Sequence, residues 1–355
     1  MELDEIRKKI DMIDAGIMRL LNERMENAVR LKKLKGEVED SEREKAVLAH
    51  VQKCSYGLVK SGFSGDIYKL IMNESKRLQN SGPLLVGFQG EHGAYSEEAS
   101  MGYNPSAVPI PCPQFEDVFE GVEKDTLDIG IVPVENSLEG AVTQVNDLLV
   151  ETTLKVVGEV RIPVHHCLLA LPETDYRDIR MVYSHQQALA QCRGFISRNK
   201  LEPRPFYDTA GAARMLASEK IRGAAVIASR LSAELYGLEV VKADIEDHHS
   251  NSTRFLVISK DGKLADGKTG NKCSMLFSAE HRAGALFSTL KIFSDAGINL
   301  TRIESRPMRN DPSKFVFLLD FLGSDQEERI KGALETVKKE AAMFKFMGCY
   351  NEAKL

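Results

Sequence analysis

Polar motifs stand after strand-like apolar segments at several places between residues 84 and 260, and they hold the strongest candidates for chemistry. They place hydroxyl, amide and carboxylate groups where helices should begin, and the free backbone N–H groups at a helix start attract anions. A single motif of this kind is usually an ordinary helix cap, but five of them in one segment favour a shared anion-binding cleft. The candidate side chains are Tyr95, Ser96, Glu135, Asn136, Ser137, Ser184, His185, Gln187, Gln191, Thr209 and Ser229.

A glycine-rich turn from Gly87 to Gly93 follows the first of these strands and leads toward a helix. Such a turn exposes backbone N–H groups to an anion. It lacks the Lys-Ser/Thr pair of a phosphate-binding P-loop and the Gly-x-Gly of a dinucleotide fingerprint. We therefore expect neither a nucleotide nor another cofactor.

A second candidate site consists of cationic and polar side chains in the first 80 residues. On one helix, Arg24 and Lys35 would share a face at a distance of roughly 16 Å, while Arg7 would lie about 25 Å from Arg24 and on a different side. Arg7 and Arg24 of one chain therefore cannot hold one small ligand, whereas Arg7 of a second chain could. A polar pocket would be completed by Arg43, Glu44, Ser75 and Gln79. The alternative is that all of these are ordinary surface charges.

Two histidine pairs, His165-His166 and His248-His249, raise the question of a metal site. Neighbouring side chains on a strand point to opposite faces, so each pair supplies one ligand at most. We therefore expect no metal site and treat these rings as hydrogen-bonded or exposed imidazoles.

The elements that must position these residues differ along the chain. Residues 1–80 contain no proline and place apolar residues at alternating steps of three and four, which predicts helices over about 3–35, 41–54 and 64–79, with Ser64 capping the third. The first helix is too long for such a small unit to cover, so its apolar face must be buried against another chain or domain. We predict a helical dimer.

Between residues 83 and 260, short apolar strands alternate with amphipathic helices, which is typical of an α/β fold with a mostly parallel sheet. This length favours two lobes with a cleft where strand ends meet helix starts. A Gly/Lys/Asp-rich linker follows, and the last segments have the order strand, helix, strand, strand, helix, strand of an α+β ferredoxin-like fold. We divide the chain into domains at 1–80, 83–260 and 272–350.

The composition limits the kind of partner. The 355 residues carry a net charge of −5, which argues against nucleic acid or an anionic membrane as the main partner. No apolar run approaches the roughly 20 residues that span a bilayer, and the charged first residues have no apolar signal core. The six cysteines are widely spaced without a metal-ligand pattern, which indicates reduced thiols in a cytoplasmic protein.

The sequences EIRKKIDMID, NERMENAVRLKKLK and DSEREK resemble the all-helical chorismate mutases over nearly all of residues 1–80. The resemblance implies an intertwined helical dimer that binds chorismate, with one arginine contributed by the other protomer. The site residues that it implies are Arg7, Arg24, Lys35, Arg43, Glu44, Ser75 and Gln79, with Asp40 as a further match. Rearranging chorismate to prephenate needs no cofactor, only the compact conformer and stabilisation of charge on the breaking ether oxygen.

The motifs PVENSLEG, SHQQALAQC and NSTRF resemble prephenate dehydratase across residues 83–260. The resemblance implies a two-lobed, periplasmic-binding-protein-like fold with the site between the lobes, and Thr253 as the key catalytic residue with Arg254 and Phe255 beside it. Prephenate loses carbon dioxide and its ring hydroxyl together, so the site needs a donor at the departing hydroxyl and a poorly solvated carboxylate. Glu135, His185 and a bound water remain open as the proton source.

The C-terminal segment resembles the ACT regulatory domain and carries both associated motifs, Gly-Ala-Leu and Glu-Ser-Arg-Pro. The resemblance implies that phenylalanine binds at the interface between paired ACT domains, normally with inhibition. The contacts that it implies are Gly284, Ala285, Leu286, Asn299, Leu300, Glu304, Ser305 and Arg306.

Together, the three resemblances imply an enzyme of phenylalanine biosynthesis that converts chorismate through prephenate to phenylpyruvate under phenylalanine inhibition. Three alternatives remain: a dehydratase that prefers arogenate, a non-catalytic amino-acid sensor, and a helical segment that serves only dimerisation. The two self-pairing regions predict a homodimer or a homotetramer.

Overall fold

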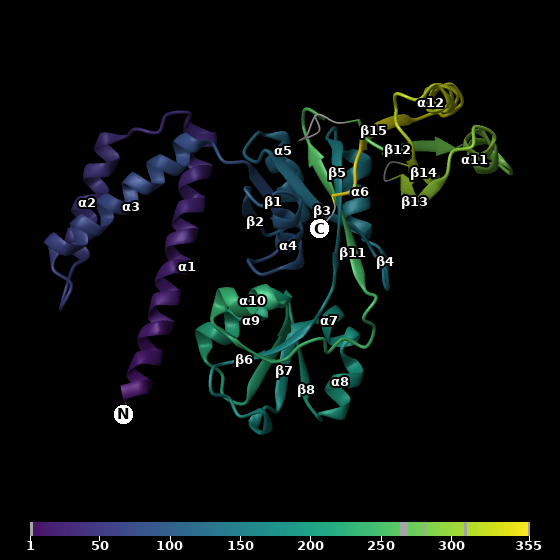
Figure 1. Cartoon of the computed structure of the whole chain (residues 1–355). Coiled ribbons are helices and arrows are strands. Elements are labelled where there is room, and N and C mark those ends of the chain that lie inside the picture. The colour runs from purple at the N-terminus through teal and green to yellow at the C-terminus, as the bar shows by residue number, and fades with distance from the viewer. Residues whose placement is uncertain (1–2, 263–268, 280–281, 309–310, 354–355) are drawn as a thin grey trace.

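The computed structural model describes residues 3–262, 269–279, 282–308 and 311–353. The chain has three parts: a helical N-terminal part, two central α/β lobes, and a small C-terminal sheet with helices on one side (Figure 1). Among the residues that the structure describes, every helix is too short or too polar to cross a lipid bilayer.

The helical part consists of α1, which projects as a long rod, and a hairpin of two shorter helices (Figure 1). Its bounds are Leu3–Lys35 for α1, Ser41–Cys54 for α2 and Ser61–Ser81 for α3. The positive φ of Gly36 ends α1, as the sequence predicts. The expected N-cap at Ser64 is wrong, because α3 already begins at Ser61. The buried Ser64 hydroxyl instead contacts the Ser55 hydroxyl and donates to the Ser61 carbonyl.

One face of α1 stays uncovered. Its exposed apolar side chains include Ile10, Ile13, Ile17 and Leu20, which are between 49% and 61% accessible. Another part of α1 lies along the second central lobe, where Met12 and Arg19 line a small cavity together with Tyr236. The neighbouring lobe therefore covers only part of the apolar surface of α1.

The first central lobe is a six-stranded sheet of order β2-β1-β3-β11-β5, with the short β4 beside β3. Its strands are Leu85–Gln89 (β1), Val108–Cys112 (β2), Ile129–Asn136 (β3), Gly140–Ala141 (β4), Lys155–Pro163 (β5) and Ser252–Ser259 (β11). Its helices are Tyr95–Tyr103 (α4), Phe115–Glu123 (α5) and Thr143–Glu151 (α6).

The second central lobe is a five-stranded sheet of order β10-β6-β9-β7-β8. Its strands are Cys167–Ala170 (β6), Met181–His185 (β7), Glu202–Phe206 (β8), Ala224–Ala228 (β9) and Glu239–Lys242 (β10). Its helices are Tyr176–Asp178 (η1, a 3₁₀ turn), Gln186–Gln191 (α7), Arg193–Arg198 (α8), Thr209–Glu219 (α9) and Arg230–Tyr236 (α10).

The expectation of a mostly parallel sheet is wrong. In the first sheet β1 is parallel to β2 and β3, whereas β11 is antiparallel to β3 and β5. The second sheet likewise has two parallel and two antiparallel pairs. The reason in the first sheet is that β5 leaves toward the second lobe and β11 returns from it, so these two strands must run in opposite directions.

Two chain crossings join the lobes, one between β5 and β6 and the other between β10 and β11. They lie side by side, since the Val164 N–H donates to the Asn251 carbonyl at 2.9 Å and the Ile245 N–H donates to the His166 carbonyl at 3.0 Å. The crossings therefore bring together the two segments that flank the expected cleft.

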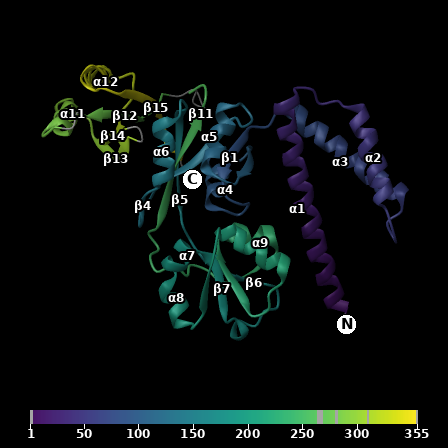
Figure 2. The same cartoon turned by 180° about the vertical axis from the view of Figure 1, so that it is seen from behind.

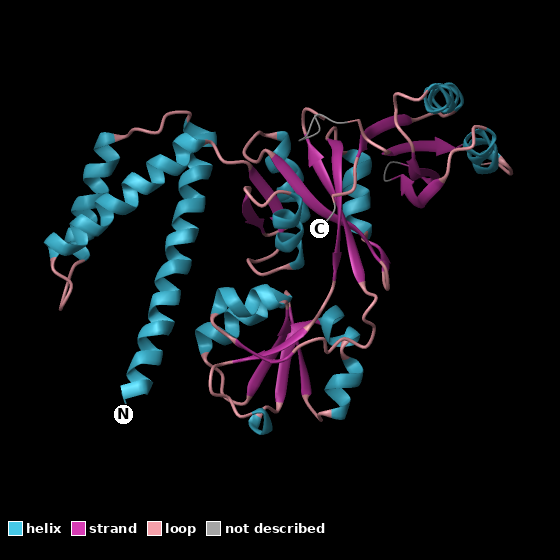
Figure 3. Cartoon of the chain, in the orientation of Figure 1, coloured by secondary structure: helices cyan, strands magenta, loops and turns pink. Residues whose placement is uncertain are grey.

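The C-terminal part has the predicted element order, and its sheet is antiparallel with the strand order β13-β14-β12-β15. Figure 3 shows both helices on the side of this sheet that is remote from the central lobes. The elements are Lys272–Ala279 (β12), Ala285–Asp295 (α11), Leu300–Met308 (β13), Asp311–Leu322 (β14), Glu328–Glu340 (α12) and Phe344–Tyr350 (β15).

The inner face of this sheet shares a hydrophobic core with the first lobe. Leu276, Leu318 and Met347 are buried in one cluster with Leu154 and Leu256. Figure 2 shows α6 on the side of the first lobe that faces the C-terminal sheet. Because apolar burial is the main stabilising term, we expect this sheet to be firmly attached to the first lobe.

Candidate functional site

A cavity of about 410 Å³ lies between the two central lobes. The first lobe and its crossing contribute Gln89, Ala94, Tyr95, Ser96, Phe115, Pro133, Asn136, Val142, Val164, Thr253 and Phe255. The second lobe and its crossing contribute His166, His185, Gln187, Ala188, Gln191, Tyr207, Asp208 and Thr209. This mixture of an apolar wall and a few convergent polar groups is typical of small-molecule sites.

Thr253 is held in place at the start of β11. The Asn136 Nδ2 donates to the Thr253 Oγ1 at 3.0 Å, while the Asn136 Oδ1 accepts from the backbone N–H groups of Leu138 and Glu139. These bonds fix the orientation of the amide, so the hydroxyl of Thr253 acts as the acceptor toward Asn136. Its own proton is then available to a bound molecule in the cavity.

A chain of polar groups crosses the cavity between the lobes. The Tyr95 hydroxyl donates to the His165 carbonyl at 2.6 Å and contacts the His166 Nδ1 at 3.0 Å. The His166 Nε2 in turn lies 2.8 Å from Gln191, whose amide donates to Glu139 at 2.9 Å. Hydrogen bonds therefore connect side chains of the two lobes across the cavity, and a movement of the lobes relative to each other would change these contacts.

Burial shifts the pKa of several cavity residues, among them Asp208, His166 and Tyr95. It raises the pKa of Asp208 above its usual value, even though the Gly211 N–H donates to this carboxylate at 2.7 Å. It lowers the pKa of His166, which favours the neutral imidazole, and it raises the pKa of Tyr95 well above the usual value. Asp208 and the Tyr95 phenol therefore keep their protons more strongly than they would in water.

Most side chains that the sequence motifs single out do line this cavity. They are Tyr95, Ser96, Asn136, His185, Gln187, Gln191, Thr209, Thr253 and Phe255. Three serines do not: Ser184 donates to the Ile227 carbonyl, Ser229 donates to the Gly93 carbonyl, and Ser137 accepts from the Ser252 N–H. These three hydroxyls stabilise the strand ends and the helix starts around the cavity.

Glu135 and Arg254 also lie outside the cavity lining. Side chains alternate along a strand, so Asn136 and Thr253 face the cavity while their neighbours face the other side of the sheet. The Arg254 guanidinium is only 2% exposed, and it binds Glu159 and Asp320 at 2.6 Å each. The carboxylates that Arg254 binds in this structure therefore belong to the protein itself, and its role in substrate binding stays a prediction.

The candidate residues chosen from the sequence do not include several cavity residues, notably Phe115, His166, Tyr207 and Asp208. Asp208 caps α9 through the Gly211 N–H, and such a cap is a recognisable signal beside Thr209. His166 belongs to a histidine pair that was assigned no site. Phe115 and Tyr207 carry no motif, because an isolated aromatic residue does not reveal which cavity it faces.

The histidine pairs each contribute one ring to a cluster at the lobe crossings. His165 and His249 place their Nδ1 atoms 2.9 Å and 3.2 Å from one carboxylate oxygen of the buried Glu246. The ligand atoms of His165, Asp244 and Glu246 lie within 4.8 Å of one another. Burial opposes the charge of Glu246, but the histidine and backbone hydrogen bonds lower its pKa, so hydrogen bonds already account for this arrangement.

The polar residues of the helical part are only partly assembled. The Arg24 guanidinium donates to the Ser75 hydroxyl at 2.6 Å, and Lys35 lies 3.4 Å from Asp40. Glu44 pairs with Lys76 at 3.1 Å, and Gln79 accepts from Lys32 through its backbone carbonyl. The remaining residues of this set are Arg7, near the free end of α1, and Arg43, whose backbone N–H donates to Asp40.

The two C-terminal motifs occupy the first helix start and the edge strand β13. Gly284 has a φ of 83° just before α11, and open space surrounds the position of a Cβ there. Ala285 and Leu286 form the first turn of α11, while Leu300 begins β13 and the Asn299 carbonyl accepts from the Leu322 N–H.

In the second C-terminal motif, Glu304 and Ser305 lie on β13, and Arg306 binds both oxygens of Asp147 on α6 at 2.6 Å and 3.1 Å. Arg306 therefore attaches β13 to the first lobe. The exposed Ser305 faces away from this contact.

Three family models match the chain in order. They are "Chorismate mutase type II" at residues 6–80, "Prephenate dehydratase" at residues 86–263 and "ACT domain" at residues 274–339.

Curated proteins and a solved structure are similar over long stretches. A bifunctional chorismate mutase/prephenate dehydratase of Neisseria gonorrhoeae is 36% identical over 98% of this chain and 97% of its own length. An arogenate dehydratase/prephenate dehydratase of Arabidopsis thaliana is 38% identical over 78% of this chain and 75% of its own length. The structure of a prephenate dehydratase from Arthrobacter aurescens in complex with L-Phe is 31% identical with a TM-score of 0.70, and the match covers 76% of this chain and 90% of that one.

Proposed function

Because this chain belongs to the bifunctional chorismate mutase/prephenate dehydratases with an ACT domain, we propose that its two reactions take place at the two polar sites described above. The enzyme rearranges chorismate to prephenate and converts prephenate to phenylpyruvate. The domains that we assign to these steps are 1–80 for the mutase, 83–260 for the dehydratase and 272–350 for the ACT domain.

The observation that carries the dehydratase assignment is the position of Thr253 in the cavity between the lobes. Its hydroxyl accepts from Asn136 and can donate to the departing ring hydroxyl of prephenate. A threonine is a weak acid, so the proton must come from a stronger donor. Of the groups considered from the sequence, His185 lines the cavity and Glu135 does not, and Asp208 adds a carboxyl whose pKa burial raises above its usual value.

The rest of the cavity would bind and desolvate the substrate. The polar side chains Ser96, Gln187, Gln191 and Thr209 come from both lobes, so closure of the lobes would bring them onto one ligand. Phe115, Pro133 and Phe255 offer an apolar wall for the ring that becomes aromatic. Removing water around the carboxylate that leaves as carbon dioxide lowers the cost of losing its charge.

For the mutase step, we infer a site formed by two chains. Arg24, Lys35, Arg43, Glu44, Ser75 and Gln79 would come from one protomer, with Asp40 beside Lys35, and Arg7 from the other. The arginines would bind the two carboxylates of chorismate, and Lys35 and Gln79 would donate to the breaking ether oxygen. The exposed apolar face of α1 supports this pairing, since a second chain would cover it.

We infer phenylalanine as the regulatory ligand, near Gly284–Leu286, Asn299–Leu300 and Glu304–Arg306 of paired ACT domains. The open space beside Gly284 would let the backbone approach the amino acid. Pairing through both the helical part and the ACT domain would give a homodimer or a homotetramer. The free thiols of all six cysteines support a reducing compartment, so we place the enzyme in the cytoplasm.

Chorismate turnover by the purified full-length protein tests these assignments together. Prephenate and phenylpyruvate are followed without added metal or cofactor, without an acid quench, and with or without phenylalanine. We expect phenylpyruvate to appear after transient prephenate and to be suppressed by phenylalanine. Prephenate that accumulates without phenylpyruvate would favour arogenate as the substrate of the second site, and the absence of any turnover would favour an amino-acid sensor.

A further inference from the structure

Arg254 follows Thr253 on β11, but its side chain lies among charges between the dehydratase sheet and the ACT sheet. The guanidinium is 2% exposed, and it binds Glu159 of β5 and Asp320 of β14 at 2.6 Å each. It also donates to the Tyr350 hydroxyl of β15 at 3.2 Å. A residue next to the expected catalytic hydroxyl thus binds two different strands of the regulatory sheet.

The same cluster also contains side chains from the other two strands of that sheet, β12 and β13. The Ser274 hydroxyl of β12 donates to Asp320 at 2.6 Å and lies 2.6 Å from the Tyr350 hydroxyl. Lys272 of β12 binds both oxygens of Glu159 at 2.7 Å and 2.8 Å, and Arg302 of β13 lies 3.8 Å from Asp320. Burial opposes the charge of Asp320, but Arg254 and Arg302 hold the pKa of this carboxyl below its usual value, so it stays ionised.

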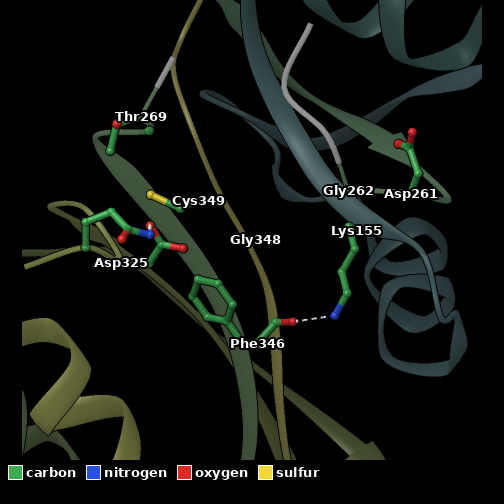
Figure 4. A pocket seen from close by; sticks show the side chains of 10 residues that line it. Lys155, Asp261, Gly262, Thr269, Asp325, Phe346, Gly348 and Cys349 are labelled. Carbon is green, nitrogen blue, oxygen red and sulfur yellow. Dashed lines mark hydrogen bonds between the residues drawn. The ribbon is translucent and has the colours of Figure 1, made fainter. Parts of the chain in front are cut away.

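Backbone contacts hold the two sheets in register around this cluster. The Ala353 N–H donates to the Glu159 carbonyl at 2.7 Å, and the Glu159 N–H donates to the Asn351 carbonyl at 3.2 Å. At Gly348 the strands approach so closely that a Cβ would lie 2.2 Å from the Val156 carbonyl oxygen. Figure 4 shows Gly348 on β15 and the nearby contact in which Lys155 of β5 donates to the Phe346 carbonyl of β15, at 2.9 Å.

The cluster also lies close to the proposed phenylalanine contacts. Arg302 and Asp320 are register partners on β13 and β14, and Leu300 is paired with Phe321. The Asn299 carbonyl accepts from the Leu322 N–H at 2.9 Å. A ligand that moves the start of β13 would therefore displace the segment of β14 that carries Asp320.

One donor in the cluster has no acceptor. The Arg254 Nε is buried and finds no hydrogen-bond partner among the described residues. A buried N–H without a partner is unfavourable, so this arrangement of the guanidinium is less stable than one that satisfies every donor. The Arg254 guanidinium can therefore respond to a small displacement of its partners, because a rotation of the guanidinium can exchange one acceptor for another.

We propose that Arg254 is a positioning residue through which the ACT sheet sets the place of Thr253, and that the Asp320–Arg254 pair carries the phenylalanine signal to the dehydratase site. The proposal rests on the proposed function, since it takes Thr253 as the catalytic group and phenylalanine as the ligand. It replaces the expectation that Arg254 binds substrate. Arg254 acts through its neighbour on the strand and has no contact with the reacting atoms.

Asp320→Asn is the central variant, because it removes the charge and keeps the shape and the Ser274 contact. Hydrogen exchange of residues 252–259 is measured in the full-length protein with and without phenylalanine, beside prephenate turnover. We expect phenylalanine to change exchange there in the wild type and not in the variant, and its inhibition constant to rise about tenfold or more. An exchange response that is equal in both proteins, or absent from both, overturns the proposal.

Arg254→Lys distinguishes positioning from substrate binding. It keeps the charge and loses the fork that bonds two partners at once. We expect kcat for prephenate to fall while KM changes little. A rise in KM at constant kcat would show direct substrate binding and would overturn the proposal. Arg161→Lys is the matched control, because Arg161 is the register partner of Arg254 on β5 but pairs with Glu352 at an exposed position, at 3.9 Å.

These measurements separate the proposal from the assigned function. If the wild-type protein shows no prephenate turnover, the dehydratase assignment is contradicted. The exchange response of residues 252–259 to phenylalanine still tests whether the Asp320–Arg254 pair connects the ACT sheet to β11. Mutase turnover and thermal unfolding are recorded for every variant. A double variant, Arg254→Met with Asp320→Leu, removes both charges at once, so a folding defect of a single unpaired charge cannot imitate the loss of the signal.

Discussion

The proposed dehydratase cavity and the proposed mutase site differ in how much of each site a single chain supplies. The cavity is lined by side chains from both lobes, and Thr253 is already bonded to Asn136, whose own amide is fixed by two backbone N–H groups. In the helical part, Arg24 reaches Ser75, but Arg7 lies near the far end of α1. The side chains around the cavity therefore come from one chain, whereas the proposed mutase site would take Arg7 from a second chain.

The cause of this difference is the shape of the two parts. The lobes bury their apolar residues in cores of their own, with Val257 and Val226 fully inaccessible. The helix α1 has 33 residues and too few neighbours, so Ile13 remains 61% exposed. Association with a second chain, as proposed above, would cover this apolar face and would also supply the missing arginine.

The variant Thr253→Ala should separate the two sites with the largest effect. Loss of a single hydrogen bond to the transition state typically costs about 10²–10³ in kcat. We expect prephenate turnover to fall by this factor and chorismate turnover to stay unchanged, as measured with each substrate separately. Ser252→Ala is the control, because this neighbouring side chain is outside the cavity lining. Full dehydratase activity in Thr253→Ala would contradict the assignment.

The variant Arg24→Ala should have the opposite selectivity. Removing a charged group that binds a substrate carboxylate is expected to lower mutase kcat/KM by about 10²-fold, because charge-assisted hydrogen bonds are the strong ones. Prephenate turnover should not change. Arg30→Ala serves as control, since Arg30 is an exposed residue of the same helix. Unchanged mutase turnover in Arg24→Ala would assign the helical part a purely structural role.

Mixing Arg7→Ala with Arg24→Ala tests whether the site is shared between chains. In a mixed dimer, one site receives both mutations and the other receives neither, so random exchange should restore about a quarter of wild-type mutase activity in an equal mixture. The measurement is chorismate turnover after unfolding and joint refolding. Each variant refolded alone is the control, and a mixture no more active than these would show that Arg7 and Arg24 act within one chain.

Strong local patterns predicted the helical part and the C-terminal sheet well. The steps of three and four gave α1 and α2 with their observed ends, and the six C-terminal elements have the expected order. Strands β2 and β8 are hard to recognise in the sequence, because each contains two prolines. Both are edge strands, where a residue without an N–H is tolerated on the side that faces solvent.

The cavity was predicted in part, and the reason is geometrical. Motifs at the ends of β3 and β7 identified Asn136 and His185, because parallel strands bring such ends to one edge. Thr253 lies at the same edge, because β11 begins where its antiparallel partner β3 ends. The sequence could not give the direction of Arg254, since alternation places it opposite Thr253 only when the strand and its partners are known. The salt bridge with Asp320 joins residues that are 66 positions apart, and no local pattern reports such a contact.

The smallest predicted effect concerns the contact between α1 of the helical part and the first central lobe. The His92 ring lies between Glu26 of α1 at 3.1 Å and Glu97 of α4 at 2.8 Å. Burial alone would lower the pKa of this imidazole, but the two carboxylates raise it to about 10. Since the ordinary value is 6.5, the charged ring should stabilise the attachment of α1 fully below pH 6.5, and this stabilisation is lost as the pH rises through 10.

The variant His92→Gln should therefore lower the free energy of unfolding at pH 7 by about 1–2 kcal/mol, after allowance for the partial exposure of the ring to solvent. At pH 10 the difference from the wild type should shrink, because the imidazole of the wild type is then losing its proton. Urea unfolding at both pH values measures this difference, and the comparison between proteins cancels the titration of other groups. A difference that is equal at pH 7 and pH 10 would show that packing, not charge, joins α1 to the first lobe. Glu26→Gln should give the same pH profile, because the interaction needs both charges.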